Sequence, residues 1–235
     1  MRFPATTALA ALTLSACAGT TPLEAPSAPL YPIAVYDPFE PVNRSIYRFN
    51  ASFDRYIFLP VVRGYEWLLP DPVERRVSSF FSNLGEIRNA ANGLLQARPE
   101  VASRATIRFA VNSTLGLLGL FDVAGAMGVE QQREDFGQTL GRWGVSGGPY
   151  IVLPILGPSN LRDTTGTVVD RGVMTQLPPW DVVIDEVYVN PAVYGLEAVD
   201  ERHLNPFRYY GTGSPFEYEY VRYLYTKKRQ FDVKR

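Results

Sequence analysis

The amino-acid sequence predicts a mainly α-helical protein, built from amphipathic helices that lie in a membrane, with little or no β structure. Two observations predict the helical class. Apolar residues recur at spacings of three and four along much of the chain, and there is neither a series of alternating strands nor an internal repeat. A third observation bounds the function: 46% of the 235 residues are hydrophobic and the net charge is −1, which permits one sizeable core and does not favour a nucleic-acid partner.

Residues 1–16 have the composition of a bacterial secretion signal, with a small, apolar run after Arg2. The run ends in Leu14-Ser15-Ala16-Cys17, which resembles the lipobox of bacterial lipoproteins. We therefore expect Cys17, the only cysteine, to carry the lipid anchor, which leaves no thiol for a disulfide. Residue 18 is alanine rather than aspartate. By resemblance to sorted lipoproteins, this favours the periplasmic leaflet of the outer membrane.

The rest of the chain divides into three parts. Residues 17–36 carry four prolines and predict an extended, lipid-anchored tether. Residues 37–230 form the expected helical domain, and residues 231–235 a short basic tail.

The first helix of the domain has an apolar face and a basic face. Apolar residues recur from Val42 to Ile57, and Arg44, Arg48 and Arg55 lie opposite. Such a helix either lies in a membrane interface or packs on a soluble core. We expect Arg44 and Arg48 to contact lipid head groups or a polar lumen.

Two further helices follow an aromatic piece, 61–69, that is bracketed by prolines. The sequence Asp71-Pro72-Val73-Glu74 predicts a helix start with aspartate as the cap. The apolar face of this helix extends from Val73 to Leu95, and Pro99 begins another helix that runs toward Asn112.

Leu115 to Val129 is apolar throughout except for one acid, Asp122. The stretch is shorter than the roughly 20 apolar residues that a membrane-spanning helix needs. It is therefore either a buried core helix or a segment that enters lipid from one side, with Asp122 facing protein or a polar cavity. In the second case, the candidate membrane or lipid-path segment comprises Leu115, Leu117, Leu118, Leu120, Phe121 and Asp122.

A polar connection and a glycine-rich run come next. We expect Gln131 to Glu134 to be solvated, and Phe136 to Asp163 to be irregular and flexible. Ile151 to Leu156 is the one strand-like run, interrupted by Pro154. Because glycine leaves the backbone conformationally free, we expect a gating role for the glycines of this run. The candidates are Gly141, Gly144, Gly147 and Gly148.

The C-terminal part is less informative. Trp180 to Val189 is apolar with interspersed acids and predicts a helix beside a channel. Ser214-Pro215-Phe216-Glu217 predicts the start of a tyrosine-rich helix with a basic end.

Three groups of motifs, in order along the chain, resemble the VacJ/MlaA family. They are Asp37-Pro38-Phe39-Glu40 with Asn43-Arg44; Asn112, Leu115-Gly116 and Phe121-Asp122-Val123-Ala124; and Phe136-Gly137, Thr139-Leu140-Gly141, Gly144-Val145, Gly148-Pro149-Tyr150 and Leu161-Arg162-Asp163. With the lipobox, the resemblance covers nearly the whole mature chain.

The resemblance implies a mostly helical, ring-shaped body in the inner leaflet of the outer membrane, surrounding an amphipathic channel. It implies a protein that removes mislocalised phospholipid from the outer leaflet and thereby maintains lipid asymmetry. The implied partners are phospholipid, a trimeric porin and a soluble periplasmic carrier of the MlaC kind, with no cofactor.

Two alternatives stand beside this hypothesis. Gly144-Val145-Ser146-Gly147-Gly148 matches the G-x-S-x-G pattern of lipases, so a membrane-anchored phospholipase using Ser146 is one. That pattern needs a strand before the serine and a helix after it, and Pro149 follows closely here. The only histidine, His203, lies in a charged cluster, and with a lipidated cysteine no metal site is expected. The second alternative is a structural tether to a porin or the cell wall.

Overall fold

The computed structural model of the protein describes residues 35–174 and 191–235. The expected signal, Cys17, almost all of the tether and the Trp180–Val189 segment lie outside the described residues. The elements in order are α1 (Glu40–Phe53), the π-helical η1 (Asp54–Phe58), α2 (Leu59–Leu68), α3 (Asp71–Leu95), α4 (Pro99–Thr114), α5 (Val123–Ala126), α6 (Phe136–Arg142), β1 (Tyr150–Leu153), β2 (Gly157–Asn160), α7 (Leu161–Met174), α9 (Pro191–Leu204) and α10 (Glu217–Lys234). The mainly α fold class is confirmed.

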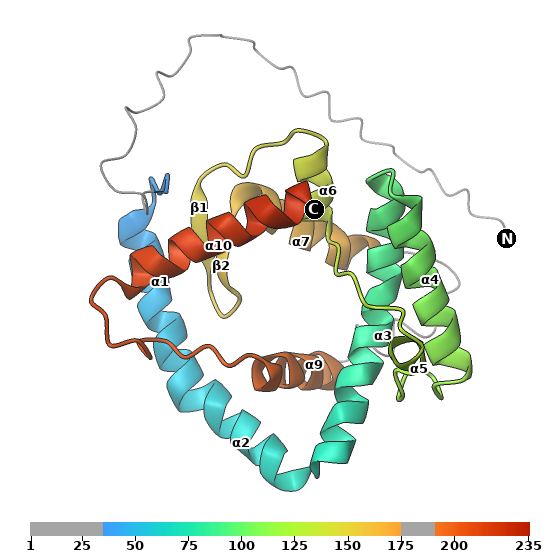
Figure 1. Cartoon of the computed structure of the whole chain (residues 1–235). Helices are drawn as coiled ribbons and strands as arrows, with labels where there is room; N and C mark the ends of the chain where they lie inside the picture. The colour runs from blue at the N-terminus through green and yellow to red at the C-terminus, as the bar shows by residue number, and fades with distance from the viewer. Residues whose placement is uncertain (1–34, 175–190) are drawn as a thin grey trace, which may run out of the picture. The chain divides into compact units, whose positions relative to one another are not determined.

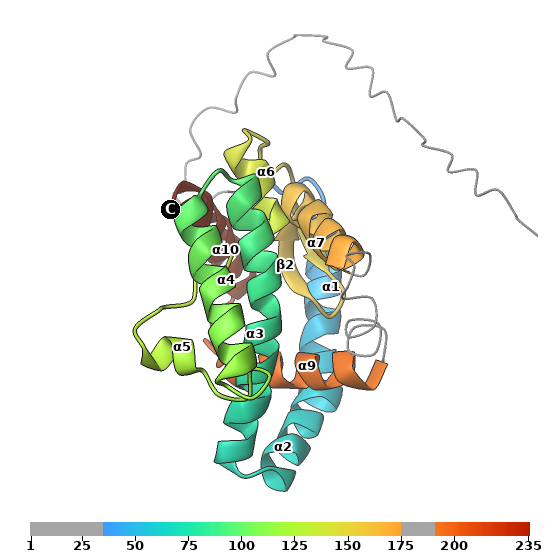
Figure 2. The same cartoon turned by 90° about the vertical axis from the view of Figure 1, so that its right-hand side faces the viewer.

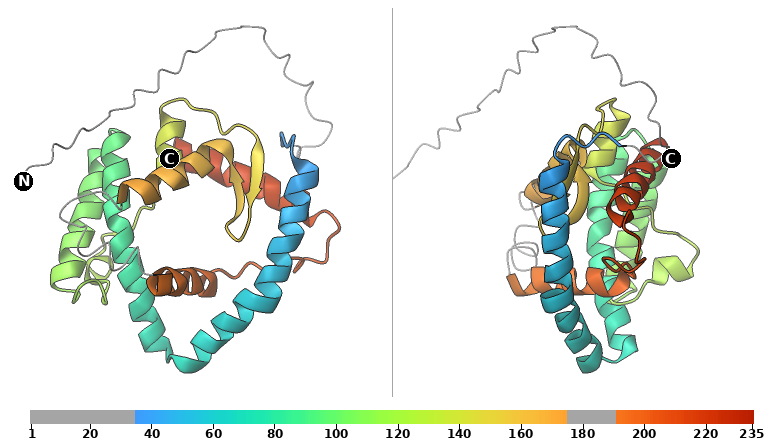
Figure 3. Two further views of the ribbon diagram at one scale, coloured as in Figure 1. Left: turned by 180° about the vertical axis from the view of Figure 1, so that it is seen from behind. Right: turned by 90° about the vertical axis from the view of Figure 1, so that its left-hand side faces the viewer.

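Residues 33–235 form one compact unit. Within it, α1, α3, α9 and the group formed by α7, α10 and the β1–β2 hairpin lie around a common centre (Figures 1 and 3). Helix α4 packs along α3, and the short α5 projects to one side of this pair (Figure 2). This is the ring-like helical body that the family resemblance implies.

Helices α1 and α3 bury mainly polar side chains and expose large apolar ones, whereas α2 and α4 also bury apolar residues. On α1, Asn43 and Asn50 are buried, whereas Val42 and Phe49 are exposed. On α3, the buried residues are Glu74, Asn83, Glu86, Asn89, Asn92 and Gly93. A helix packed on a soluble core has the opposite arrangement. The apolar face of residues 42–57 is therefore exposed at Val42, Phe49 and Ile57, and its contact with lipid stays a prediction.

An aromatic cluster lies where α1, β1 and α10 meet. It consists of Tyr47, Tyr150, Val152 and Tyr218, all buried. The ring of Tyr218 makes edge contacts with Tyr47 at 5.6 Å and with Tyr150 at 6.2 Å between centroids. These contacts hold the C-terminal helix against the first helix and the hairpin.

The hairpin is fixed to α1 by two asparagines. The β1–β2 register is antiparallel and pairs Tyr150 with Asn160 and Leu153 with Gly157. The Asn43 amide donates to the Tyr150 carbonyl at 3.0 Å and accepts from the Val152 N–H at 2.9 Å. About two helical turns further along the same face, the Asn50 amide donates to the Leu153 carbonyl and accepts from the Ile155 N–H at 2.8 Å. Side-chain amides thus satisfy the edge strand in place of a third strand.

The expectation that residues 136–163 are irregular is wrong, because α6, the hairpin and the start of α7 order them. Pro154 interrupts the strand-like run as expected, because β1 ends at Leu153 and Pro154 lies in the turn that follows. Ile155 adopts a left-handed φ of 66° in the same turn.

The aromatic piece 61–69 belongs to a helix, because α2 continues α1 through η1, with Pro60 in its first turn. One helix start differs from the sequence prediction. Asp71 is the first residue of α3 rather than its cap, and no side chain caps this helix. Among the described residues, no helix combines the length and apolarity needed to cross a membrane.

Candidate functional site

A cleft of about 810 Å³ opens between α3, α7, α10, the hairpin and the segment before α6. Its lining is amphipathic. Leu153, Leu156 and Pro158 of the hairpin supply the apolar part, and the hairpin turn points toward the centre of the unit in Figure 1. Charged side chains supply the rest: Arg88, Arg133, Glu134, Asp135, Asp163, Asp170, Arg171, Lys228, Arg229, Asp232 and Arg235.

Arg229 of α10 neutralises two of these acids. It donates to Asp135 at 2.7 Å and to Asp163 at 2.8 Å. Burial alone would raise the pKa of both carboxyls, but the hydrogen bonds and charge of Arg229 outweigh it and hold both pKa values below the usual range. Both acids are therefore ionised at neutral pH and join α6, α7 and α10.

Glu134 corrects the expectation that residues 131–134 form a solvated connection. Glu134 is only 1% exposed, and its carboxylate accepts hydrogen bonds from Arg98 at 2.8 Å and from Gln96 at 3.2 Å. The backbone N–H of Glu134 donates to the side chain of Asn89. A polar interior can bury this carboxylate because an arginine and an amide accompany it.

The same kind of polar contact joins α3 to α4. Arg108, with its side chain 3% exposed, donates to the fully buried Glu86 at 2.5 Å and to Asp122 at 3.0 Å. Gln131 donates to the same Glu86 oxygen at 3.0 Å.

Asp122 faces protein, as its isolation in an apolar stretch requires. Besides Arg108, it accepts from the Asn112 amide and from the Gly125 N–H, both at 2.9 Å, and so caps α5. Burial tends to raise the pKa of Asp122, but these hydrogen bonds and Arg108 leave the pKa lowered.

The Leu115–Val129 stretch is not a single helix. Helix α4 ends at Thr114, turns follow, and α5 covers four residues. Leu115, Leu117 and Leu118 are 69%, 61% and 73% exposed, so the buried core helix is wrong. Leu117 and Leu118 both have left-handed φ values, 52° and 60°. Leu120 and Phe121 are also exposed, and lipid contact by this segment stays a prediction.

The four candidate gating glycines are not equivalent. Gly141 lies inside α6, where an added Cβ would come within 2.6 Å of Val233. Gly144, with φ +91°, follows α6 and has open space around it. Gly147 and Gly148 lie in the connection to β1, and Gly148 has φ +68°. Because none of the four lines the cleft, their gating role stays a prediction.

Arg44 and Arg48 have different surroundings. Arg44 binds Glu40 at 2.8 Å, pairs with Glu219 and lies over the ring of Tyr218. Arg48 is exposed and donates to Ser45 at 3.2 Å. Contact with head groups or a lumen is therefore a prediction that suits Arg48 better than Arg44.

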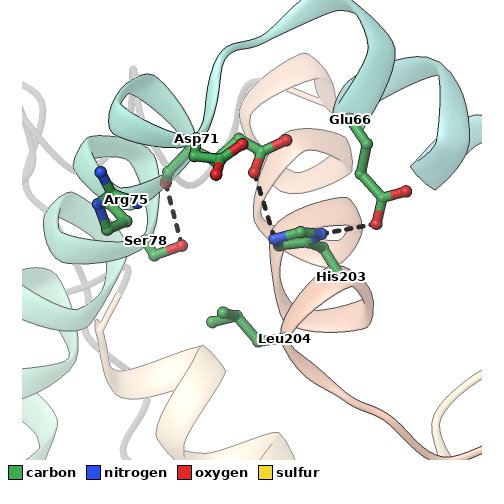
Figure 4. Close-up of a pocket in the computed structure, with 7 residues that line it drawn as sticks. Glu66, Asp71, Arg75, Ser78, His203 and Leu204 are labelled. Atoms are coloured by element: carbon green, nitrogen blue, oxygen red, sulfur yellow. Dashed lines mark hydrogen bonds and ion pairs between the residues drawn. The ribbon is translucent and has the colours of Figure 1, made fainter.

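Ser146 and His203 do not form a catalytic pair in the described part of the chain. Ser146 is exposed after α6 and before β1, which reverses the strand–serine–helix order of a lipase. His203 lines a separate pocket, of about 450 Å³, that does not include Ser146. Its ring nitrogens face Glu66 at 2.8 Å and Glu74 at 3.5 Å (Figure 4). No cluster of metal-ligating side chains occurs among residues 35–174 and 191–235.

Sequence reasoning missed the polar residues that build the site. Asn43, Asn50, Asn89 and Asn92 recur at helical spacings, opposite or between apolar positions. This asparagine pattern could have indicated a buried polar face, because a stripe of asparagines opposite a fully apolar helix face is unusual for a solvated surface.

Comparisons with known proteins agree with this arrangement. The family model for the MlaA lipoprotein matches residues 35–232. An uncharacterised protein of Rickettsia felis is 42% identical over 145 residues, 62% of this chain and 58% of that protein. The chain thus spans less than two thirds of that relative's length. The intermembrane phospholipid transport system lipoprotein MlaA of Haemophilus influenzae is 35% identical over 178 residues, 72% of this chain and 67% of that protein.

A solved structure has a TM-score of 0.70 with this chain at 29% identity, covering 85% of this chain and 100% of that one. It was described under the heading "Structural basis for maintenance of bacterial outer membrane lipid asymmetry". The helical ring, the paired polar interior and the family match over residues 35–232 lead to one conclusion: the chain belongs to the MlaA lipoprotein family.

Proposed function

We propose that this chain is the membrane-embedded lipoprotein of an intermembrane phospholipid transport system. In this role it takes mislocalised phospholipid from the outer leaflet of the outer membrane and passes it along the amphipathic cleft. A soluble periplasmic carrier of the MlaC kind then receives the lipid, and membrane asymmetry is maintained.

One observation carries the proposal, the reversed burial of the helices. Asn43, Asn50, Asn89 and Asn92 are buried, while large apolar side chains such as Val42, Phe49, Trp67, Leu94 and Ile107 are exposed. A surface of this kind is unfavourable in water and favourable among acyl chains. The cleft inside has charges for a head group and the hairpin leucines for acyl chains, which supports lipid passage.

The anchor and the protein partners complete the proposal. Lipidation at Cys17 would hold the chain in the periplasmic leaflet of the outer membrane, and a trimeric porin would be its neighbour there. The exposed apolar residues of the Leu115–Phe121 segment would contact lipid. We propose that no enzymatic step is involved, since Ser146 lacks both the strand before it and a nearby histidine.

The test is complementation in cells that lack their own copy, with phospholipid in the outer leaflet as the measurement. The wild-type chain should return surface phospholipid to the basal level. Cys17→Ala should fail, because the chain is not anchored. If Cys17→Ala still fractionates with the outer membrane and restores asymmetry, the lipoprotein assignment is wrong.

Two controls separate the alternatives. Ser146→Ala should complement fully, and loss of function at normal protein level would indicate a phospholipase. Purified wild-type protein should carry phospholipid with intact ester bonds. Protein free of phospholipid that still binds a porin would instead indicate a structural tether.

A further inference from the structure

Two arginines of the cleft have no ion pair among the described residues. Arg88 on α3 and Arg171 on α7 both line the cleft, and neither makes an ion pair with any described residue. The Nε of Arg88 is inaccessible to solvent and has no hydrogen-bond acceptor. Because buried donors are nearly always satisfied, this N–H is available to an acceptor that the described residues do not supply.

The acids of the cleft are already occupied. Glu134 is bound by Arg98, Asp135 and Asp163 by Arg229, and Asp232 by Lys228. Asp170, one residue before Arg171, accepts from the Asn92 amide at 3.0 Å and from the Phe136 N–H at 2.8 Å. On α9, burial raises the pKa of Glu197, and the charges of both arginines partly oppose this, but neither arginine forms an ion pair with Glu197 within 4.0 Å. The charge of Arg88 also acts on Asp170, but no described carboxylate of the cleft lies within ion-pair distance of Arg88 or Arg171.

We propose that Arg88 and Arg171 form a subsite for the phosphate group of a phospholipid, with Leu153 and Leu156 on the acyl-chain side. A guanidinium matches a phosphate in geometry and charge, and it binds through paired N–H groups. The hairpin leucines line the same cleft, so one amphipathic molecule contacts both parts. This proposal rests on the proposed function and names the residues that would hold the head group.

The experiment uses the full-length lipidated protein in detergent and three probes. The probes are dihexanoylphosphatidylglycerol, uncharged dihexanoylglycerol and inorganic phosphate. The variants are Arg88→Gln with Arg171→Gln, and Arg63→Gln as the matched control, since Arg63 is exposed on α2 outside the cleft. We expect the double variant to weaken phosphatidylglycerol binding by about tenfold or more, the size of a lost charged hydrogen bond. Dihexanoylglycerol binding should not change, and Arg63→Gln should match the wild type.

The outcomes separate the two proposals. If the double variant binds phosphatidylglycerol as the wild type does, the subsite is wrong and lipid transport still stands. If it loses both lipids equally, the arginines support the fold and the subsite is again wrong. If inorganic phosphate competes at the same concentration as the lipid, the ligand is free phosphate rather than a head group. Failure of the wild type to bind any lipid would overturn the proposed function itself.

Discussion

The contact between α3 and α4 combines a buried ion pair with small apolar residues of α4, whereas the contact among α1, β1 and α10 is centred on tyrosine rings. Between α3 and α4, Glu86 and Arg108 are buried and ion-paired, while Leu94 and Ile107 are exposed. Where α1, β1 and α10 meet, tyrosine rings and Val152 are buried. In an apolar surrounding, helices gain little by burying apolar residues, so hydrogen bonds and ion pairs specify the packing. The exposed apolar residues of α3 and α4 are what the proposed function requires of helices that face acyl chains. The tyrosine cluster buries its own apolar surface and does not depend on surrounding lipid.

The largest expected effect comes from breaking the polar contact. Arg108→Ala leaves Glu86 buried without its counterion, which typically costs about 3–5 kcal/mol of unfolding free energy. Arg104→Ala, one turn earlier on α4 and without an ion pair among the described residues, is the matched control. Chemical unfolding in detergent measures both. Equal stabilities of the two variants would mean that the ion pair does not specify the contact.

The next effect sharpens the contrast between lipid-facing and buried apolar residues. Because Leu118 is 73% exposed, Leu118→Asp removes no core packing, and aspartate tolerates its left-handed backbone. If this loop enters lipid, the charge costs roughly 2.5–3.5 kcal/mol of insertion. Binding to vesicles should therefore fall, while unfolding in detergent stays as in Leu118→Ala. Unchanged vesicle binding would place the loop outside the membrane.

The sequence predicted the helical class because the spacing of its apolar residues is independent of what surrounds them. The same spacing could not show which face is buried. Val42 and Phe49 belong to an apolar face that fits either a core or a membrane, and they are exposed, whereas Asn43 and Asn50 are buried. Which face is buried depends on whether water or acyl chains surround the helix, and the spacing of apolar residues does not show this. The candidate site was partly predictable, since Asp122 alone in an apolar stretch required a partner. Its partner Arg108 and the buried Glu134 depend on contacts distant in sequence.

A smaller effect concerns pH and the polar wall of the cleft. Asp135 and Asp163 have pKa values held below 3.8 by Arg229, so their contribution to stability is present above pH 3.8 and is lost as pH falls through the folded values. Arg229→Met should raise both pKa values, because burial is then opposed only by the hydrogen bonds of Gln138 to Asp135 and of Tyr225 and Arg162 to Asp163. The variant should be less stable than the wild type at neutral pH and should lose less stability as the pH falls below 3.8. Lys228→Met, whose ion pair is mostly exposed, should keep the wild-type profile. A profile of Arg229→Met that matches the wild type would show that the two carboxyls are not linked to folding.

The smallest expected effect on stability tests the glycine gate. Gly144 has φ +91° and open space for a side chain, so Gly144→Ala costs only backbone strain, about 1 kcal/mol. Gly141→Ala makes a poor test of gating, because its Cβ would press on Val233 and Arg162 and loosen α6 from α10. Gly144→Ala restricts the backbone before the hairpin while leaving both neighbouring contacts in place. If the connection from α6 to β1 gates lipid passage, outer-leaflet phospholipid should rise or fall in this variant at normal protein level and anchoring. If it stays at the wild-type level, the connection is a passive turn, and lipid passage would depend on the cleft walls alone.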